Sequence, residues 1–301
     1  MNVTPVFPGT YYVCAGGKAL LAGCPPEVVK VLMQRKLASP DAILLPDIPV
    51  SHGESQIAIE FPLYHHIFFG AQSDEPDPLL LCGNPARVKA ALELLELTLF
   101  GPPVPEMVEW GMPEEQAEAL SRETRWFHLK DKSGKPYPLD KLVTSKSFDD
   151  EPIDVGWIQI KRIRTNVFEL SADGERKVID LNLEDEQGPP YPVNVDLTPT
   201  TLVKLGIEVL GGSTGFSTTQ ASSGLALCYN GNYMLIDAIP FLNYHLRARG
   251  IARNQINSIF LSHIHDDHCN LISLLQYNRR IRVLTTEIIY RMMLRKLALT
   301  L

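Results

Sequence analysis

The feature that most constrains this chain is the sequence Ser-His-Ile-His-Asp-Asp-His at residues 262–268, which follows a short apolar run. The apolar run predicts a strand, and a strand feeding a loop would point His263 and His265 the same way because side chains alternate along it. Asp267 and His268, where the loop turns into the next helix, would face a second position nearby. Imidazole and carboxylate ligands together suit zinc, manganese or iron. The pattern therefore predicts half of a two-metal site, at which a bridging water is activated for attack on an ester or phosphodiester.

The plain alternative for this stretch is a polar loop with surface histidines. The chain has 8 histidines in 301 residues, and three of them fall here, between a predicted strand and a predicted helix, which favours the metal site. At these residues the chain resembles the metallo-β-lactamase superfamily, whose hallmark is His-x-His-x-Asp-His. That hallmark is filled by His263, His265, Asp267 and His268, and Asp266 falls at a position that varies in the family. The resemblance is specific for the superfamily and weak for the substrate.

The resemblance implies a four-layered αββα sandwich with metal ligands from both halves. It covers residues 205–301, which is the first half of that fold, and its layout is closest to the phosphodiesterase and transfer-RNA-processing branches. The remaining ligands are expected beyond Leu301, which falls in an apolar helix without a C-cap signal; the alternative is that they come from a partner chain. We therefore expect a fragment of a longer protein, one that binds metal weakly and turns over little as it stands.

The composition is that of a globular protein, with 45% hydrophobic and 21% charged residues. A formal net charge of -7 argues against a broad nucleic-acid or anionic-membrane surface. No secretory signal and no run of membrane-spanning length is found, so no membrane partner is expected. Cysteines are odd in number, 5, and show no paired spacing. Reduced thiols in a cytoplasmic protein are the expectation.

Strands alternating with helices predict a layered α/β arrangement, and the order of elements recurs. We interpret the recurrence as an internal duplication. The matched segments are 17–25 with 231–240, 27–35 with 241–249, 43–45 with 259–261, and 79–95 with the strand at 281–284 and its following helix. In this alignment Asp47 stands opposite His263, and His52 is the one residue that matches its counterpart, His268. The first copy is thus predicted to have lost the metal.

The fold class that we expect is α/β: a partial metallo-β-lactamase-like αββα sandwich preceded by a degenerate α/β unit of similar layout. Residues 1–190 form the predicted N-terminal unit, metal-free and with a β-hairpin near 157–183. Residues 191–301 form the predicted N-terminal half of a hydrolase domain. The first unit is expected to serve shape or dimerisation, so a homodimer through it is one expectation.

Two further candidates lie upstream of the histidine motif. A Gly-rich stretch at 211–215 resembles, by its position, the loop that borders the active site in family members, which makes Ser213 and Thr214 substrate-loop candidates. The alternative is an ordinary loop between two strands. Asp237 ends a predicted strand, and the resemblance gives it the role of orienting a ligand histidine by accepting its other N–H. His245, on the helix that follows, is expected at the surface.

The function that we predict first is a metal-dependent hydrolase of a phosphodiester, such as a cyclic nucleotide or a nucleic-acid end. Two divalent ions are expected, zinc first and manganese or iron next, with Asp267 also orienting a bridging hydroxide or taking its proton. Thioesters and lactones are the next substrates. The oxygen-reducing, iron-containing branch usually carries an acidic residue where Ile264 stands, which speaks against it. A non-catalytic binding or scaffold protein is the remaining alternative.

Overall fold

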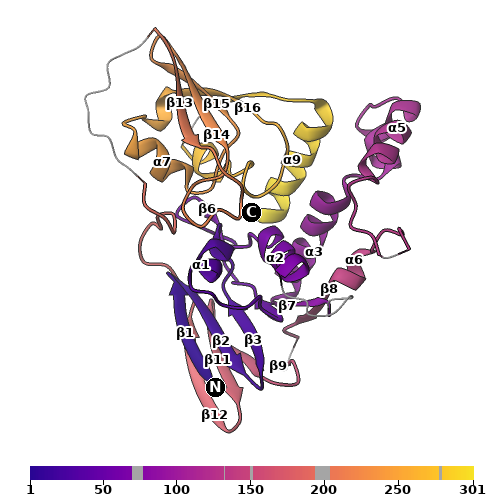
Figure 1. Ribbon diagram of the computed structural model, residues 1–301, viewed down its shortest axis with the longest axis vertical. Coiled ribbons are helices and arrows are strands. Elements are labelled where there is room, and N and C mark those ends of the chain that lie inside the picture. The colour runs from indigo at the N-terminus through magenta and orange to yellow at the C-terminus, as the bar shows by residue number, and fades with distance from the viewer. Residues whose placement is uncertain (70–76, 132, 150–151, 194–203, 278–279) are drawn as a thin grey trace.

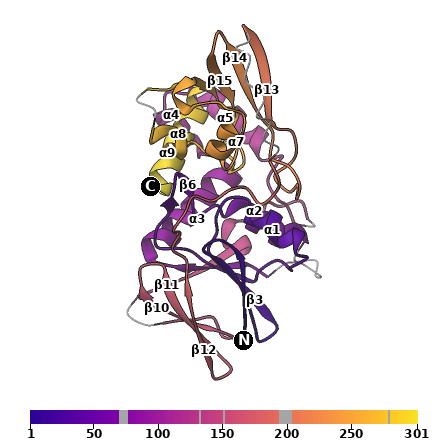
Figure 2. The same ribbon diagram turned by 90° about the vertical axis from the view of Figure 1, so that its left-hand side faces the viewer.

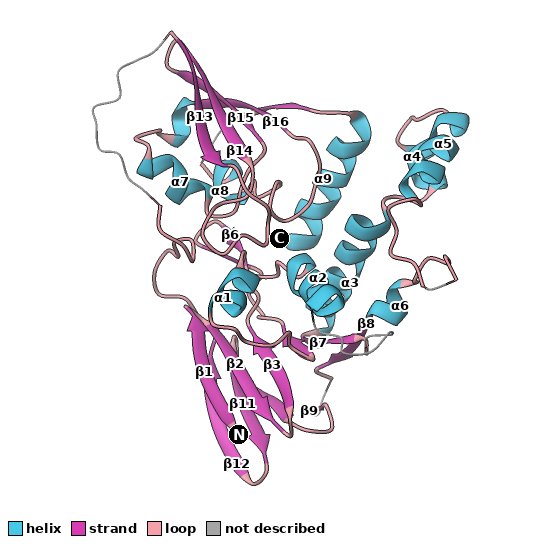
Figure 3. Cartoon of the chain, viewed as in Figure 1, coloured by secondary structure: helices cyan, strands magenta, loops and turns pink. Residues whose placement is uncertain are grey.

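The computed structural model describes residues 1–69, 77–131, 133–149, 152–193, 204–277 and 280–301 (Figure 1). Helices and strands are mixed throughout, which confirms the α/β class (Figure 3). The strands are β1 Asn2–Phe7, β2 Thr10–Ala15, β3 Lys18–Ala22, β4 Ala42–Leu44, β5 Val50–Ser51, β6 Glu54–Ser55, β7 Leu79–Gly83, β8 Val143–Ser147, β9 Ile153–Asp154, β10 Gln159–Arg164, β11 Val167–Ala172, β12 Glu175–Asp180, β13 Leu205–Gly211, β14 Gly224–Tyr229, β15 Asn232–Ile236, β16 Ile256–Phe260 and β17 Arg282–Leu284. The helices are α1 Val28–Gln34, α2 Glu60–Phe69, α3 Pro85–Phe100, α4 Val104–Glu109, α5 Glu114–Thr124, α6 Leu139–Leu142, α7 Leu242–Ala248, α8 Ile272–Leu275 and α9 Glu287–Thr300, with a short 3-10 turn at Arg253–Gln255.

Two of the sheets repeat one topology. The six-stranded sheet has the order β1-β2-β3-β4-β7-β8, and the five-stranded sheet has the order β13-β14-β15-β16-β17. In each, the first three strands are antiparallel and the next two join in parallel. The helix after the third strand begins each time from a left-handed residue, Glu27 (φ 58) before α1 and Phe241 (φ 54) before α7. The strand order thus contains the layout repeat expected from the sequence.

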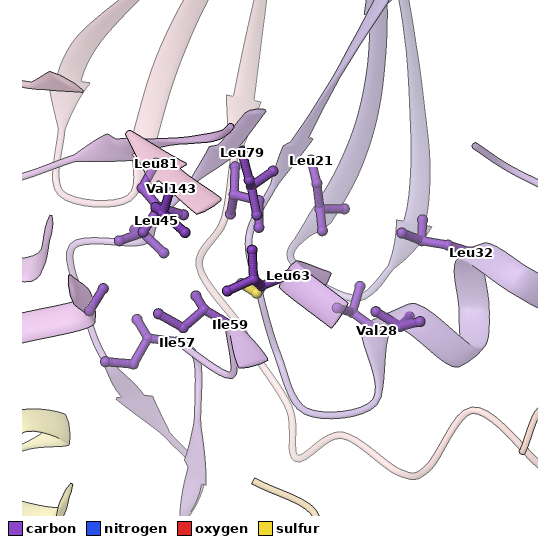
Figure 4. Close-up of a cluster of buried hydrophobic side chains, with 14 of the residues drawn as sticks. Leu21, Val28, Leu32, Leu45, Ile57, Ile59, Leu63, Leu79, Leu81 and Val143 are labelled. Carbon is purple, nitrogen blue, oxygen red and sulfur yellow. The ribbon is translucent and has the colours of Figure 1, made fainter. Parts of the chain in front are cut away.

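The six-stranded sheet is covered on both faces, and its central strands β3, β4 and β7 are largely apolar and buried, as strands covered on both faces require. One face packs under α1, α2 and α3, where Leu21, Leu45 and Leu81 meet Leu32 and Leu63 (Figure 4). The opposite face packs on the four-stranded antiparallel sheet β12-β11-β10-β9. This second core is formed by Val13, Leu20 and Leu44, which alternate with the side chains of the first face, and by Ile160, Phe168 and Leu170 of the four-stranded sheet.

The five-stranded sheet is covered on one face only among the residues described. Its covered face carries Leu235 and Ile259, which pack against α7, α8 and α9. Its other face exposes a row of large apolar side chains, at positions that correspond by strand pairing to the covered second face of the six-stranded sheet. They are Leu205, Ile207, Val209, Tyr229, Phe260 and Leu284.

The two sheets are joined by helices from both. Figures 1 and 2 show α1, α2 and α3 between the six-stranded and five-stranded sheets. Leu97 of α3 is buried in the same cluster as Met293 of α9, and those helices pack side by side. Within the described residues, no helix has the length and apolar character that a membrane crossing needs.

The alignment of His52 with His268 is wrong. The loop after β4 contains the hairpin β5–β6, which has no counterpart among the described residues after β16, and His52 lies at its turn with φ 51. Gln56 is the residue equivalent to His268. The residue after each of them forms an isolated parallel β-bridge with a residue just beyond the end of β3 or β15. Those bridges are Cys24–Ile57 and Ala238–Cys269.

Candidate metal centre

Asp237 ties the histidine loop to the end of β15. Its carboxylate accepts hydrogen bonds from the backbone N–H of Ser262 (2.8 Å), from the Ser262 hydroxyl (2.7 Å) and from Nδ1 of His268 (3.0 Å). The residue has φ 59, a left-handed conformation that Asp adopts more readily than most non-glycine residues. This geometry turns the carboxylate back onto the loop, and the contact with His268 is the one on which the predicted orienting role depends.

The structure brings the predicted ligands together in two overlapping groups. In the first, ligand atoms of Asp237, His263 and His268 lie within 4.8 Å of one another, and in the second those of His263, His265 and Asp267 do. His263 belongs to both, with ring centroids 4.8 Å from His265 and 4.3 Å from His268. The sequence had paired His263 with His265 and Asp267 with His268. The structure keeps Asp267 beside His268, with 3.4 Å between the carboxylate and Nε2, and adds Asp237.

The electrostatics of this cluster divide the histidines. Burial, helped by the neighbouring imidazoles, lowers the pKa of His263 to about 4, and burial also lowers the pKa of His265. Burial alone would lower the pKa of His268 as well, but hydrogen bonds to Asp237 and Asp267 outweigh it and raise that pKa to about 9. The same hydrogen bonds hold the pKa values of both carboxyls below their usual range against the effect of burial.

The donor set fits a divalent metal. At neutral pH two imidazoles are neutral, with lone pairs available, and two carboxylates are ionised, which are the protonation states that metal ligands need. The third imidazole, His268, holds a proton between the two carboxylates. A cation is thus already favoured at this position, and a metal ion would compete with that proton. Three imidazoles and two carboxylates suit zinc, manganese or iron.

The Gly-rich stretch borders the site, but through residues other than the two candidates. A Cβ placed on Gly215 would lie 3.0 Å from a carboxylate oxygen of Asp267, so the backbone of this stretch approaches the ligand directly. The next residue, Phe216, packs edge-on against Phe61 with ring centroids 5.2 Å apart. Ser213 pairs through its backbone with Ala221, and the carbonyl of Thr214 accepts from Ser217. Those two remain candidates by position.

Two adjoining pockets open beside the histidines. One, of about 250 Å³, is lined by His263, His265, Phe100 and Phe127 among others, and the second, of about 330 Å³, by His265, Tyr64 and the same two phenylalanines. Tyr64 packs edge-on against His265 with ring centroids 6.4 Å apart. The walls are mainly apolar and aromatic, and much of them comes from α2 and α3. These residues carry no local sequence signal for a site, because only packing brings them to the loop.

Sequence reasoning also missed two charged residues that reach the loop from remote elements. Glu60, at the start of α2, and Lys296, on α9, both contact Asp266 inside the motif. Both are buried, with exposed fractions of 0% and 6%. A buried lysine or glutamate is uncommon unless it is paired, but burial cannot be read from these isolated sequence positions.

The family model described as Anti-Pycsar protein Apyc1 matches residues 205–291, the segment that carries all five candidate ligand residues. No curated protein sequence matches the chain significantly. Among solved structures, the metallo-β-lactamase fold protein YhfI from Bacillus subtilis is similar at 15% identity and TM-score 0.32, over 56% of this chain and 53% of that one. The chain therefore spans about half the length of that protein.

Two further solved structures, a tRNase Z and an RNase Z, are also similar to the chain. The short form of human tRNase Z matches at 11% identity and TM-score 0.28, over 95% of this chain and 92% of that one. A long-form RNase Z from yeast matches at 11% identity and TM-score 0.28, over 96% of this chain and 44% of that one. The chain is thus similar, at low TM-scores, to metallo-β-lactamase fold proteins.

Proposed function

We propose that this protein is a metal-dependent hydrolase of phosphodiesters, with a cyclic nucleotide as the first substrate. The observation that carries the proposal is the pair of overlapping ligand groups, three imidazoles and two carboxylates gathered at the end of one parallel strand pair. The match of the Apyc1 family model to this segment favours a cyclic nucleotide over other phosphodiesters.

The five side chains would divide the work as follows. His263, His265, His268 and Asp267 would hold the metal, as the sequence pattern predicts. Bound divalent ions supply a Lewis acid for the phosphodiester oxygen and make an attacking water more acidic. Asp237 holds the His268 ring by accepting from Nδ1, so that Nε2 faces Asp267. The lowered pKa of Asp267 keeps that carboxylate ionised, ready to orient a water or take its proton.

The aromatic pockets support a substrate with one flat apolar part and one anionic part. The phosphodiester would lie at the histidines, and the adjoining cavities of about 250 and 330 Å³ have aromatic walls against which a base could stack. The overall charge of -7 and the apolar lining favour a small nucleotide over a long nucleic acid, which needs a basic track for its backbone.

The test combines metal content with a substrate panel. Metal is measured after exhaustive dialysis for the wild type, for His263→Ala/His265→Ala and for His52→Ala, which removes a histidine from the equivalent loop of the first sheet. The panel holds cyclic mononucleotides, a linear dinucleotide, a thioester and a lactone. We expect the wild type and His52→Ala to retain more metal than the double variant, and to hydrolyse a cyclic mononucleotide slowly, in line with the weak metal binding and low turnover expected of the chain as it stands.

Other outcomes would redirect the proposal. A wild type without bound metal and without turnover would favour a binding or scaffold protein. Bound metal with turnover of the thioester or the lactone alone would retain the hydrolase and reject the phosphodiester.

We also propose that the protein acts in the cytoplasm and forms a homodimer through its N-terminal unit. The first proposal rests on the odd number of cysteines and their spacing. The second rests on a first unit that repeats the layout of the site-bearing sheet without its histidine motif. Sedimentation analysis of the intact chain would test the dimer.

A further inference from the structure

The two residues of the motif that are not predicted ligands face a common partner. Ile264 and Asp266 alternate with the ligands His263, His265 and Asp267 along the chain. The Ile264 carbonyl and the Asp266 carboxylate both accept from a single ammonium group.

That ammonium group belongs to Lys296 of α9, and all three of its donors are used. Nζ lies 2.6 Å from the carbonyl oxygen of Ile264, 2.7 Å from Oδ1 of Asp266 and 3.3 Å from Oε1 of Glu60. The lysine side chain is 8% exposed and that of Glu60 is 0% exposed. A buried charge is tolerated when its hydrogen bonds are complete, as here, and the arrangement then has one well-defined geometry.

Glu60, the first residue of α2, also contacts Asp266 directly. Its Oε2 accepts from the backbone N–H of Asp266 (3.0 Å), and its own backbone N–H lies 3.4 Å from Oδ2 of Asp266. The two carboxylates and the lysine therefore fix both the backbone and the side chain at the centre of the motif. They come from α2, from the loop and from α9, elements that are remote in sequence.

We infer that Glu60 and Lys296 are positioning residues for the metal centre. Together they set the path of the loop at Ile264 and Asp266, and thereby keep the ligand atoms of His263, His265 and Asp267 within 4.8 Å of one another. Through Glu60, a helix packed on the six-stranded sheet thereby contributes to a site whose ligands all lie in loops of the five-stranded sheet. This inference rests on the proposed metal site for its function, but its geometry exists without metal.

The test uses three variants of the whole chain. Lys296→Met removes the charge while it keeps a long unbranched side chain, and Glu60→Gln is the conservative change that keeps an acceptor for the Asp266 N–H. The matched control is Arg295→Met, next along α9, where the arginine pairs with both oxygens of Glu106 at 2.8 Å and does not touch the loop. The control also loses one salt bridge of the same helix.

The first measurement needs no metal. Amide hydrogen exchange is followed across residues 262–268 of the dialysed proteins. We expect Lys296→Met to speed exchange there at least tenfold, Glu60→Gln to have a smaller effect, and Arg295→Met to leave the loop unchanged. Equal protection in Lys296→Met and wild type would overturn the inference, and so would equal loss in Lys296→Met and Arg295→Met. If Lys296→Met does not fold, Glu60→Gln against the control decides by the same readout.

The second measurement uses Co²⁺ as the probe. Cobalt affinity and the visible absorption of the bound ion are compared among the variants. Loss of a group that orients a metal ligand weakens binding by about 10–100-fold, and the altered ligand geometry should change the absorption bands. We expect this loss of cobalt affinity in Lys296→Met, a smaller loss in Glu60→Gln, and wild-type affinity and absorption in Arg295→Met. A wild type that binds no cobalt would count against the proposed function, while the exchange measurement would still decide on the positioning role.

Discussion

Substitutions of Asp237 distinguish two contributions to stability: the left-handed backbone conformation after β15 and the hydrogen bonds that the Asp237 carboxylate makes. Asp237→Gly leaves the left-handed conformation free of strain, since glycine adopts it readily, and Gly23 occupies the equivalent position of the first sheet with φ 88. What is lost is the carboxylate and its bonds to Ser262 and His268. At about 1–1.5 kcal/mol for each of the bonds, the free energy of unfolding should fall by roughly 3–5 kcal/mol.

Asp237→Asn makes the sharper test, because it should separate metal binding from stability. Asparagine tolerates the same backbone conformation and can still accept from the Ser262 N–H. Its amide N–H would face Nδ1 of His268, so the ring would have to place its proton on Nε2, the nitrogen that faces Asp267. A protonated nitrogen cannot bind metal. We expect a near-normal free energy of unfolding but metal affinity lowered by about 10–100-fold.

The assays are urea denaturation of the dialysed proteins and competition with a chromophoric chelator for zinc. Asn230→Gly is the control, because it exchanges another left-handed residue (φ 49) for glycine at the turn before β15, away from the ligands. The reasoning fails if Asp237→Asn binds zinc as tightly as the wild type. It fails equally if Asn230→Gly weakens zinc binding as much as the Asp237 variants do.

Two further predictions concern pH. Because the pKa of His268 is raised to about 9, a metal ion must displace the His268 proton at neutral pH. The apparent metal affinity should therefore rise by about tenfold per pH unit below 9, and calorimetry should show close to one proton released for each metal ion bound. An affinity that does not change from pH 7 to 8 would exclude proton displacement from His268. Glu54 accepts from Asn270 and from the Phe241 N–H, and burial raises its pKa to about 8. Its proton is bound more tightly in the folded than in the unfolded state, so wild-type stability should fall as pH rises from about 4.5 to 8. Glu54→Gln should make that slope shallower by the share of one proton in thermal melts at pH 5, 7 and 8.5, and an unchanged slope would refute the assignment.

The histidine loop could be predicted from the sequence because its information is local. The closely spaced ligands, the apolar strand before them and the acidic residue after β15 all lie within the one segment that runs from β15 through α7 to the loop after β16. The alignment of His52 with His268 was wrong because the equivalence of the two loops depends on the tertiary structure and not on the local sequence. His52 was matched by counting residues along the loop, and the β5–β6 hairpin changes that count.

His245 shows the same limit. It was expected at the surface of α7, but it is 1% exposed and its Nε2 lies 3.4 Å from the Tyr191 hydroxyl. Tyr191 is 54 residues away in the chain, so no helical periodicity of the segment could show what covers it. Burial, with the charges of Arg249 and Lys30, lowers the pKa of His245 to about 4, which is a consequence of packing alone.

The sequence by itself determined the side chains of the candidate donor set, their order along the loop and the α/β class, since residue type, alternation and the succession of helices and strands are local properties of the chain. Tertiary structure alone decided that His268 is the histidine whose N–H Asp237 accepts, that aromatic side chains from α2 and α3 wall the adjoining pockets, and that Glu60 and Lys296 meet across Asp266. These contacts depend on how the helices of both sheets pack against one another, and buried charges find their partners only once that packing has excluded water.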